Sequence, residues 1–148
     1  MALNQIYTQI ITENSRNPEH RHVLDCANCI KEGVNPSCGD NITLQLMVND
    51  DGVIEDAAFM GDGCAISQAS VSMMIDLIKG RPMDEAKRLA HTFIGMIKGE
   101  VTDDALLDEL EDAQAFRDIS HMPSRVKCAV LGWHTLEEAL ENAEIIHT

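Results

Sequence analysis

Residues 42–67 read ITLQLMVNDDGVIEDAAFMGDGCAIS, and this stretch decides the expected fold. At its start, apolar side chains recur at every second position, which is the period of a strand: Ile42, Leu44, Leu46 and Val48. Asp51-Gly52 is a favoured hairpin pair, so residues 53–60 are expected to return as an antiparallel strand. The sequence therefore predicts a small antiparallel sheet in the first half of the chain.

Helical patterns flank this sheet. Residues 2–15 carry isoleucines at helical spacing and precede a loop, and a second helical pattern begins at residue 65 and ends at Gly80. Further helices are expected from Pro82 to Gly99 and within residues 103–116. Residues 29–34 are too short a segment to classify. Ser124 is expected to cap a final helix, and without repeats or linkers the prediction is one α+β domain over residues 1–148.

Composition narrows the class of protein. The chain has 148 residues, and its 25 acidic against 11 basic residues give a formal charge of −14. Such a charge repels phosphate backbones and anionic lipids, so nucleic acid and membranes are not expected partners. The opening residues show no secretory signal pattern, and a cytoplasmic location is expected. Five cysteines cannot all pair as disulfides, so metal binding or thiol chemistry becomes the main question.

Three cysteines lie where a thiolate is stabilised. Cys38 stands in a turn before the first confident strand, where the following glycine allows the turn to aim Cys38 and Asp40 at one point. Cys64 lies between a strand end and a helix start, where free N–H groups favour negative charge. Cys128 follows two cationic residues near the start of the last helix. Three sulfur ligands and the Asp40 carboxylate match the tetrahedral preference of zinc, although the long spacings leave a shared site unproven.

Two other groups are weaker candidates. Cys26 and Cys29 form CANC, the spacing of half a zinc site or of a redox pair, but no partner motif lies nearby. This pair is interpreted as incidental. A minor alternative metal site is formed by His20, His22 and Cys26. It ranks below the first group because histidines in a polar loop are more often solvated than bound to a metal.

Three segments of the sequence resemble motifs of a known family. NPSCGD (35–40), GDGCAIS (61–67) and RVKCAVLGW (125–133) resemble, in order and spacing, the cysteine motifs of the SufU and IscU family. IscU scaffolds usually carry a histidine directly before the third cysteine, where this chain has Lys127. The Arg-x-Lys-Cys motif and the tryptophan that soon follows, Trp133, are similar to the SufU branch.

The resemblance implies a fold and a function. The implied fold is α+β, SufE/IscU-like, with a small antiparallel three-stranded sheet packed against several helices. The implied cofactor is zinc, held by the ligands Cys38, Asp40, Cys64 and Cys128. Cys38 would accept persulfide sulfur from a SufS-like, pyridoxal-phosphate cysteine desulfurase once a desulfurase side chain takes its zinc position, and Arg125 would help to place the partner. The sulfur would then pass to a downstream cluster scaffold.

Two alternatives remain open from the residues. The same ligands can build a [2Fe–2S] cluster on a scaffold, because iron-sulfur clusters also use cysteine thiolates. Lys127 in place of the histidine favours zinc and sulfur transfer. A structural or regulatory zinc protein would be expected to have a closed four-cysteine site, and the single carboxylate argues against it.

Overall fold

The computed structural model describes residues 3–25, 27–36, 39–121 and 123–147. Its sheet has three antiparallel strands in the order β1-β2-β3: β1 (Cys29–Asn35), β2 (Asp40–Val48) and β3 (Ile54–Asp62). The segment that could not be classified from the sequence is thus the edge strand β1. The predicted β2–β3 hairpin is confirmed, and Gly52 has a φ of +79° in its loop, a conformation that glycine adopts without strain.

The helices follow the sheet, except for the first. The bounds are α1 (Leu3–Arg16), α2 (Ala65–Ile78), α3 (Met83–Ile97), α4 (Asp104–Asp108), the 3-10 helix η1 (Glu111–His121) and α5 (Pro123–His147). The expected helices are therefore present, with the acidic segment divided between α4 and η1. The prediction that Ser124 caps the last helix is wrong, because α5 already begins at Pro123, whose fixed φ suits a first helical position.

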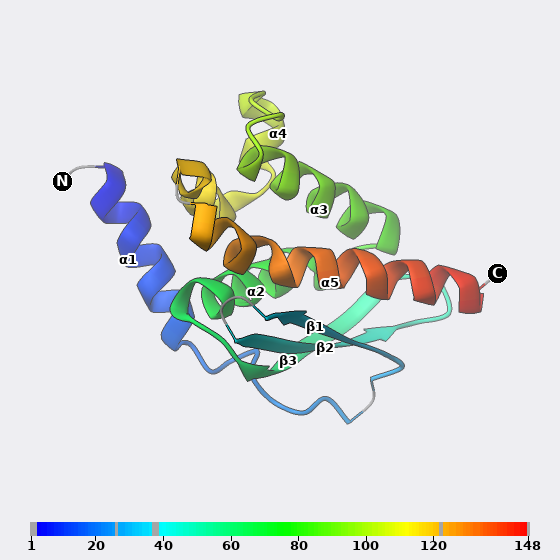
Figure 1. The fold of residues 1–148 in the computed structure, drawn as a ribbon. Coiled ribbons are helices and arrows are strands. Elements are labelled where there is room, and N and C mark those ends of the chain that lie inside the picture. The colour runs from blue at the N-terminus through cyan, green and yellow to red at the C-terminus, as the bar shows by residue number, and fades with distance from the viewer. Residues whose placement is uncertain (1–2, 26, 37–38, 122, 148) are drawn as a thin grey trace.

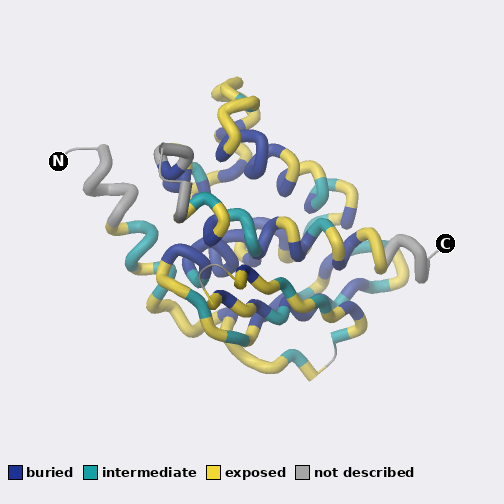
Figure 2. Tube along the Cα trace, in the orientation of Figure 1, coloured by how far each residue is buried: buried dark blue, intermediate teal, exposed yellow. Residues whose placement is uncertain are grey.

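The core lies between the sheet and the helices stacked on one of its faces (Figure 1). The alternate residues of β2 that face the helices are fully or almost fully buried, as the two-residue pattern predicts: Ile42, Leu44, Leu46 and Val48. Helix α2 is the central helix and is buried along most of its length (Figure 2). Its exposed N-terminus therefore emerges from the core at one end of the sheet.

Close contact between α2 and α5 fixes the relative position of these two helices. Gly132 in α5 lies so near α2 that an added Cβ would come within 2.5 Å of Val71 Cγ2. The buried Trp133 ring stacks on Phe93 of α3 with a centroid distance of 4.2 Å. The first turns of α5 are thus held over the N-terminal half of α2. No helix within the described parts of the chain is both long and apolar enough to span a bilayer.

Candidate metal centre

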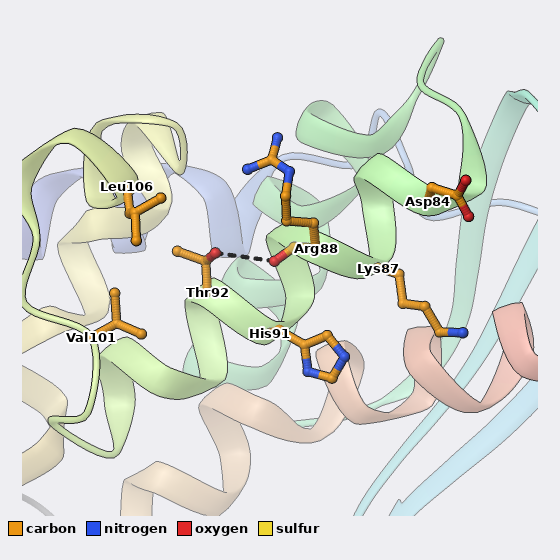
Figure 3. Close-up of a pocket in the computed structure, with 7 residues that line it drawn as sticks. All are labelled: Asp84, Lys87, Arg88, His91, Thr92, Val101 and Leu106. Atoms are coloured by element: carbon orange, nitrogen blue, oxygen red, sulfur yellow. Dashed lines mark hydrogen bonds between the residues drawn. The ribbon is translucent and has the colours of Figure 1, made fainter.

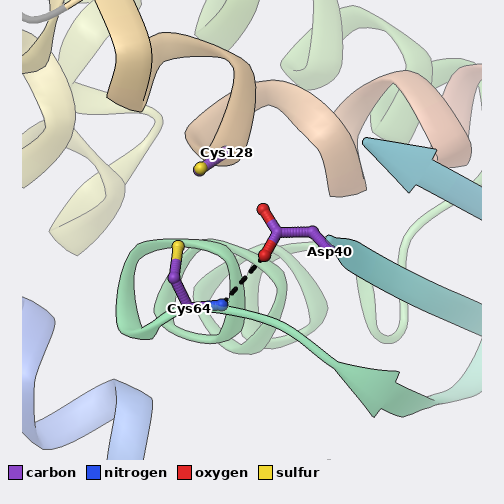
Figure 4. A group of neighbouring side chains, drawn as sticks. All are labelled: Asp40, Cys64 and Cys128. Atoms are coloured by element: carbon purple, nitrogen blue, oxygen red, sulfur yellow. Dashed lines mark hydrogen bonds between the residues drawn. The ribbon is translucent and has the colours of Figure 1, made fainter. Parts of the chain in front are cut away.

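Asp40 is the first residue of β2 and is almost completely buried, with 1% of its surface exposed. Its Oδ1 accepts a hydrogen bond from the Cys64 backbone N–H at 3.0 Å (Figure 4). Its Oδ2 accepts one from the Ser67 hydroxyl at 2.7 Å. A buried carboxylate needs such donors to offset the loss of water. Gly39, with a φ of +72°, provides the turn that the sequence predicted before this residue.

Cys64 is the N-cap of α2. Its Sγ accepts the Ser67 backbone N–H at 3.5 Å, so sulfur takes the place of the oxygen usually found at this position. This sulfur is exposed at the N-terminal end of the helix. The predicted setting of Cys64, between a strand end and a helix start, is confirmed.

Cys128 lies in the second turn of α5 and is buried. Two hydrogen bonds hold this part of α5 against α2: the Trp133 indole N–H donates to Ser70 Oγ at 2.9 Å, and the Ser70 hydroxyl donates to the Ala129 carbonyl at 2.6 Å. Buried hydrogen bonds of this kind restrict a helix to one position. They bring Cys128 over the N-terminus of α2, facing Asp40 and Cys64 (Figure 4).

Ser67 contacts Asp40, Cys64 and Cys128, although the sequence pattern assigned no role to this serine. Its fully buried hydroxyl donates to Asp40 Oδ2 and also lies 3.4 Å from the Cys128 carbonyl and 3.6 Å from Cys64 Sγ. The available signal was its place three residues after the N-cap, where the N–H meets the capping side chain. A buried serine that touches parts of three candidate ligands is a positioning residue.

The ligand atoms of Asp40, Cys64 and Cys128 all lie within 4.8 Å of one another. Zinc holds sulfur at about 2.3 Å and carboxylate oxygen at about 2.0–2.2 Å, so ligands of one ion sit about 3–4 Å apart. The described residues therefore fit a shared ion after small side-chain shifts. Cys38, the fourth predicted ligand, lies outside the described residues. Arg125 is exposed on α5, one turn before Cys128.

The remaining candidates are not part of this group. Cys29 is buried beneath α5, its thiol donates to the Ala139 carbonyl at 3.2 Å, and burial raises the pKa of that thiol. Cys26 lies outside the described residues. The two described members of the minor histidine cluster have different surroundings. His22 is exposed, whereas the buried His20 contacts Asp76, with 2.5 Å between His20 Nε2 and Asp76 Oδ1. Glu19 completes a second group whose ligand atoms lie within 4.8 Å of one another.

A hollow of about 520 Å³ lies on another part of the surface (Figure 3). It is lined by residues of α3 together with Val101 and Leu106, and none of the described lining residues is a cysteine. Arg88 at its edge pairs with Glu109, and His91 Nδ1 lies 3.1 Å from a Glu137 carboxylate oxygen. Because these side chains are already paired within the protein, the hollow adds no ligand to the metal centre.

Comparison with known proteins places this geometry in a family. The chain matches the NifU-like N terminal domain over residues 6–101. It is 37% identical over 142 residues to the zinc-dependent sulfurtransferase SufU of Bacillus subtilis, covering 96% of this chain and 94% of that protein. It is 42% identical over 141 residues to the iron-sulfur cluster assembly scaffold protein IscU of Thermotoga maritima, covering 95% and 96%.

A solved structure agrees with the observed fold. The crystal structure described as an iron-sulfur cluster assembly scaffold protein for the SUF system of Fervidobacterium islandicum superposes with a TM-score of 0.84 at 36% identity. It covers 94% of this chain and 99% of that one. The chain therefore belongs to the NifU-like N-terminal domain family, in the SufU and IscU group of iron-sulfur cluster assembly proteins. The predicted three-stranded α+β fold is confirmed.

Proposed function

We propose that this protein accepts sulfur from a cysteine desulfurase for iron-sulfur cluster assembly and holds one zinc ion on Cys38, Asp40, Cys64 and Cys128. The observation that carries the proposal is the convergence of Asp40, Cys64 and Cys128, whose ligand atoms lie within 4.8 Å of one another. Bound zinc would keep the ligating thiols deprotonated. The similarity to the Bacillus subtilis sulfurtransferase supports the assignment.

The chain's own residues have separate tasks in this proposal. Asp40 is oriented by the Cys64 N–H and the Ser67 hydroxyl, so its carboxylate stays in place as a hard oxygen ligand. Cys64 and Cys128 are anchored by helices α2 and α5. The sequence predicts a glycine turn at Cys38, and we assign this residue the role of sulfur acceptor because a turn restricts a side chain less than a helix does.

The proposed sulfur transfer from the desulfurase to Cys38 needs no outside oxidant. The Cys38 thiolate attacks the outer sulfur of a persulfide on the pyridoxal-phosphate desulfurase. A sulfur–sulfur bond forms on Cys38, the bond within the desulfurase persulfide breaks, and the desulfurase cysteine leaves as a thiolate. The transferred sulfur keeps its proton. Arg125, exposed near Cys128, is proposed to contact the desulfurase, and a downstream cluster scaffold is the proposed sulfur recipient.

A [2Fe–2S] scaffold is the second candidate, favoured by the similarity to the Thermotoga maritima scaffold protein. Both functions use the same ligands. Lys127 supports the zinc proposal, because IscU scaffolds usually carry a histidine at this position. Lys127 directly precedes Cys128 in the sequence, and it is exposed whereas Cys128 is buried.

Elemental analysis of protein purified without added metal, together with its visible spectrum, tests the choice of metal. We expect a colourless protein with about one zinc per chain, as four ligands require. A brown protein that contains iron and no zinc would contradict the proposal and support the scaffold function.

A second experiment tests the acceptor. Wild-type protein should accelerate the desulfurase and gain sulfur mass on the peptide that contains Cys38, and Cys38→Ala should abolish the acceleration. The control is Cys29→Ser, whose thiol is buried away from the group. Persulfide found only on Cys64 or Cys128, or full acceleration by Cys38→Ala, would show that another cysteine is the acceptor.

A further inference from the structure

Asn35 at the end of β1 has a buried side chain that the local fold does not explain. Only 6% of the residue is exposed, and its Nδ2 has no hydrogen-bond partner among the described residues. Buried polar groups are almost always hydrogen-bonded, because losing water without a replacement costs stability. An amide that stays buried without a partner is expected to serve a group that the protein binds.

The position of Asn35 indicates which group that is. Asn35 pairs with Asp40 across the β1–β2 register, and directly opposed residues project to the same face of a sheet. Asn35 and Lys127 also line one groove of about 420 Å³ between β1 and α5. Asn35 thus lies beside Asp40, in a strand that packs against α5, the helix that carries Cys128.

We propose that Asn35 Nδ2 donates a hydrogen bond to a sulfur anion held at this centre. The inference rests on the proposed function and extends it by adding a donor for the bound sulfur. Both Asp40 oxygens already accept hydrogen bonds, from the Cys64 N–H and the Ser67 hydroxyl. Metal-bound thiolates and persulfides are the additional acceptors that such a centre creates, and hydrogen bonds to sulfur tune metal–sulfur sites.

Ser72 provides a matched control. Its hydroxyl is the other buried side-chain atom without a partner among the described residues. Ser72 lies in α2, eight residues beyond Cys64, which corresponds to about 12 Å along the helix axis. Removing the Ser72 hydroxyl therefore removes a buried unpartnered group without touching the centre.

The first experiment compares Asn35→Leu, Asn35→Ala and Ser72→Ala with wild type, with and without zinc. We expect the metal-free Asn35 variants to melt no lower than Ser72→Ala. Their zinc-induced rise in Tm should be smaller than in wild type, and zinc affinity by chelator competition should fall on the order of 10-fold. Two substitutions of Asn35 are included so that the measurement can still be made if one of the variants does not fold.

Cobalt substitution gives an independent spectroscopic measurement. A hydrogen bond lowers the energy of the sulfur lone pairs, so the sulfur-to-cobalt charge-transfer band should move to longer wavelength in both Asn35 variants and stay unchanged in Ser72→Ala. Persulfide lifetime on the protein after reaction with desulfurase and cysteine is then measured. A changed band identifies a ligand thiolate as acceptor, whereas an unchanged band with a shortened lifetime identifies the persulfide sulfur.

The outcomes separate this inference from the proposed function. Wild-type protein that takes up no zinc and no sulfur would overturn the proposed function and, with it, the role of Asn35. Wild-type protein that binds zinc while both Asn35 variants match it in Tm rise, affinity, cobalt band and persulfide lifetime would overturn only the role of Asn35.

Discussion

Among the residues that the structure describes, two groups of side chains have the spacing of a metal site, and they differ in donor chemistry. Asp40, Cys64 and Cys128 combine two sulfurs with one buried carboxylate. Glu19, His20 and Asp76 combine a buried imidazole with two exposed carboxylates. Thiolates select zinc or iron-sulfur clusters, whereas the second set is already joined by the contact between His20 Nε2 and Asp76 Oδ1 at 2.5 Å.

Spacing alone therefore does not define a functional centre. In the second group, the His20 carbonyl accepts the Phe59 N–H of β3, while the imidazole meets Asp76 of α2. These contacts tie the loop after α1 to both the sheet and the central helix. We interpret this group as a structural clamp and the first as the reactive centre, and the following predictions test that distinction.

The largest effect is expected from removing a sulfur ligand. Cys64→Ser and Cys128→Ser should each lower zinc affinity by at least about 100-fold, because ligand loss exceeds the 10–100-fold typical of supporting residues. Chelator competition and zinc content after dialysis measure the effect. If either variant keeps wild-type zinc affinity, the substituted cysteine is not a zinc ligand, and the assignment of this group as the reactive centre is wrong.

Ser67→Ala should have the next largest effect. The hydroxyl orients Asp40, so its loss should weaken zinc binding by about 10-fold, within the range for supporting residues. Ser67→Thr retains a hydroxyl and tests whether hydrogen bonding or packing is responsible. Equal affinity of Ser67→Ala and wild type would show that Asp40 needs no such support.

Breaking the clamp should change stability and leave metal content unchanged. Asp76→Ala removes the partner of the buried His20, which should lower the free energy of unfolding by about 1 kcal/mol. Urea denaturation measures this loss, and elemental analysis should give the same zinc content as wild type. A fall in zinc content would mean that the second group also binds metal.

The smallest effect is expected at Cys29. Burial raises the pKa of its thiol, so the folded protein keeps the thiol protonated at a pH where the unfolded chain, with a thiol pKa of about 8.5, ionises. Stability is therefore lost as the pH rises above that value. Wild type should lose slightly more stability than Cys29→Ala between pH 8 and 10, as measured by denaturation at each pH. Identical pH dependence would contradict this account.

Much of the fold follows from local patterns. The alternation along β2, the turn at Gly52 and the helical spacing of α2 and α3 each depend on neighbours within a few residues, so the sequence predicts them. Two features were beyond such reasoning. The strand β1 is a short edge strand that is defined by pairing with β2, and α5 begins two residues earlier than a cap at Ser124 predicts.

Local sequence patterns predict the candidate ligand types and their settings: a glycine turn before Asp40, a helix N-terminus at Cys64 and a cationic helix start at Cys128. The convergence of these three residues and their connection through Ser67 come from the packing of distant segments. The reason is physical. Convergence depends on how α5 packs on α2 through Trp133 and Ser70, and on the β2–β3 register, which pairs Asn41 with Asp62 and so brings Asp40 near Cys64. Long-range packing of this kind leaves no periodic signal in the residues near each ligand.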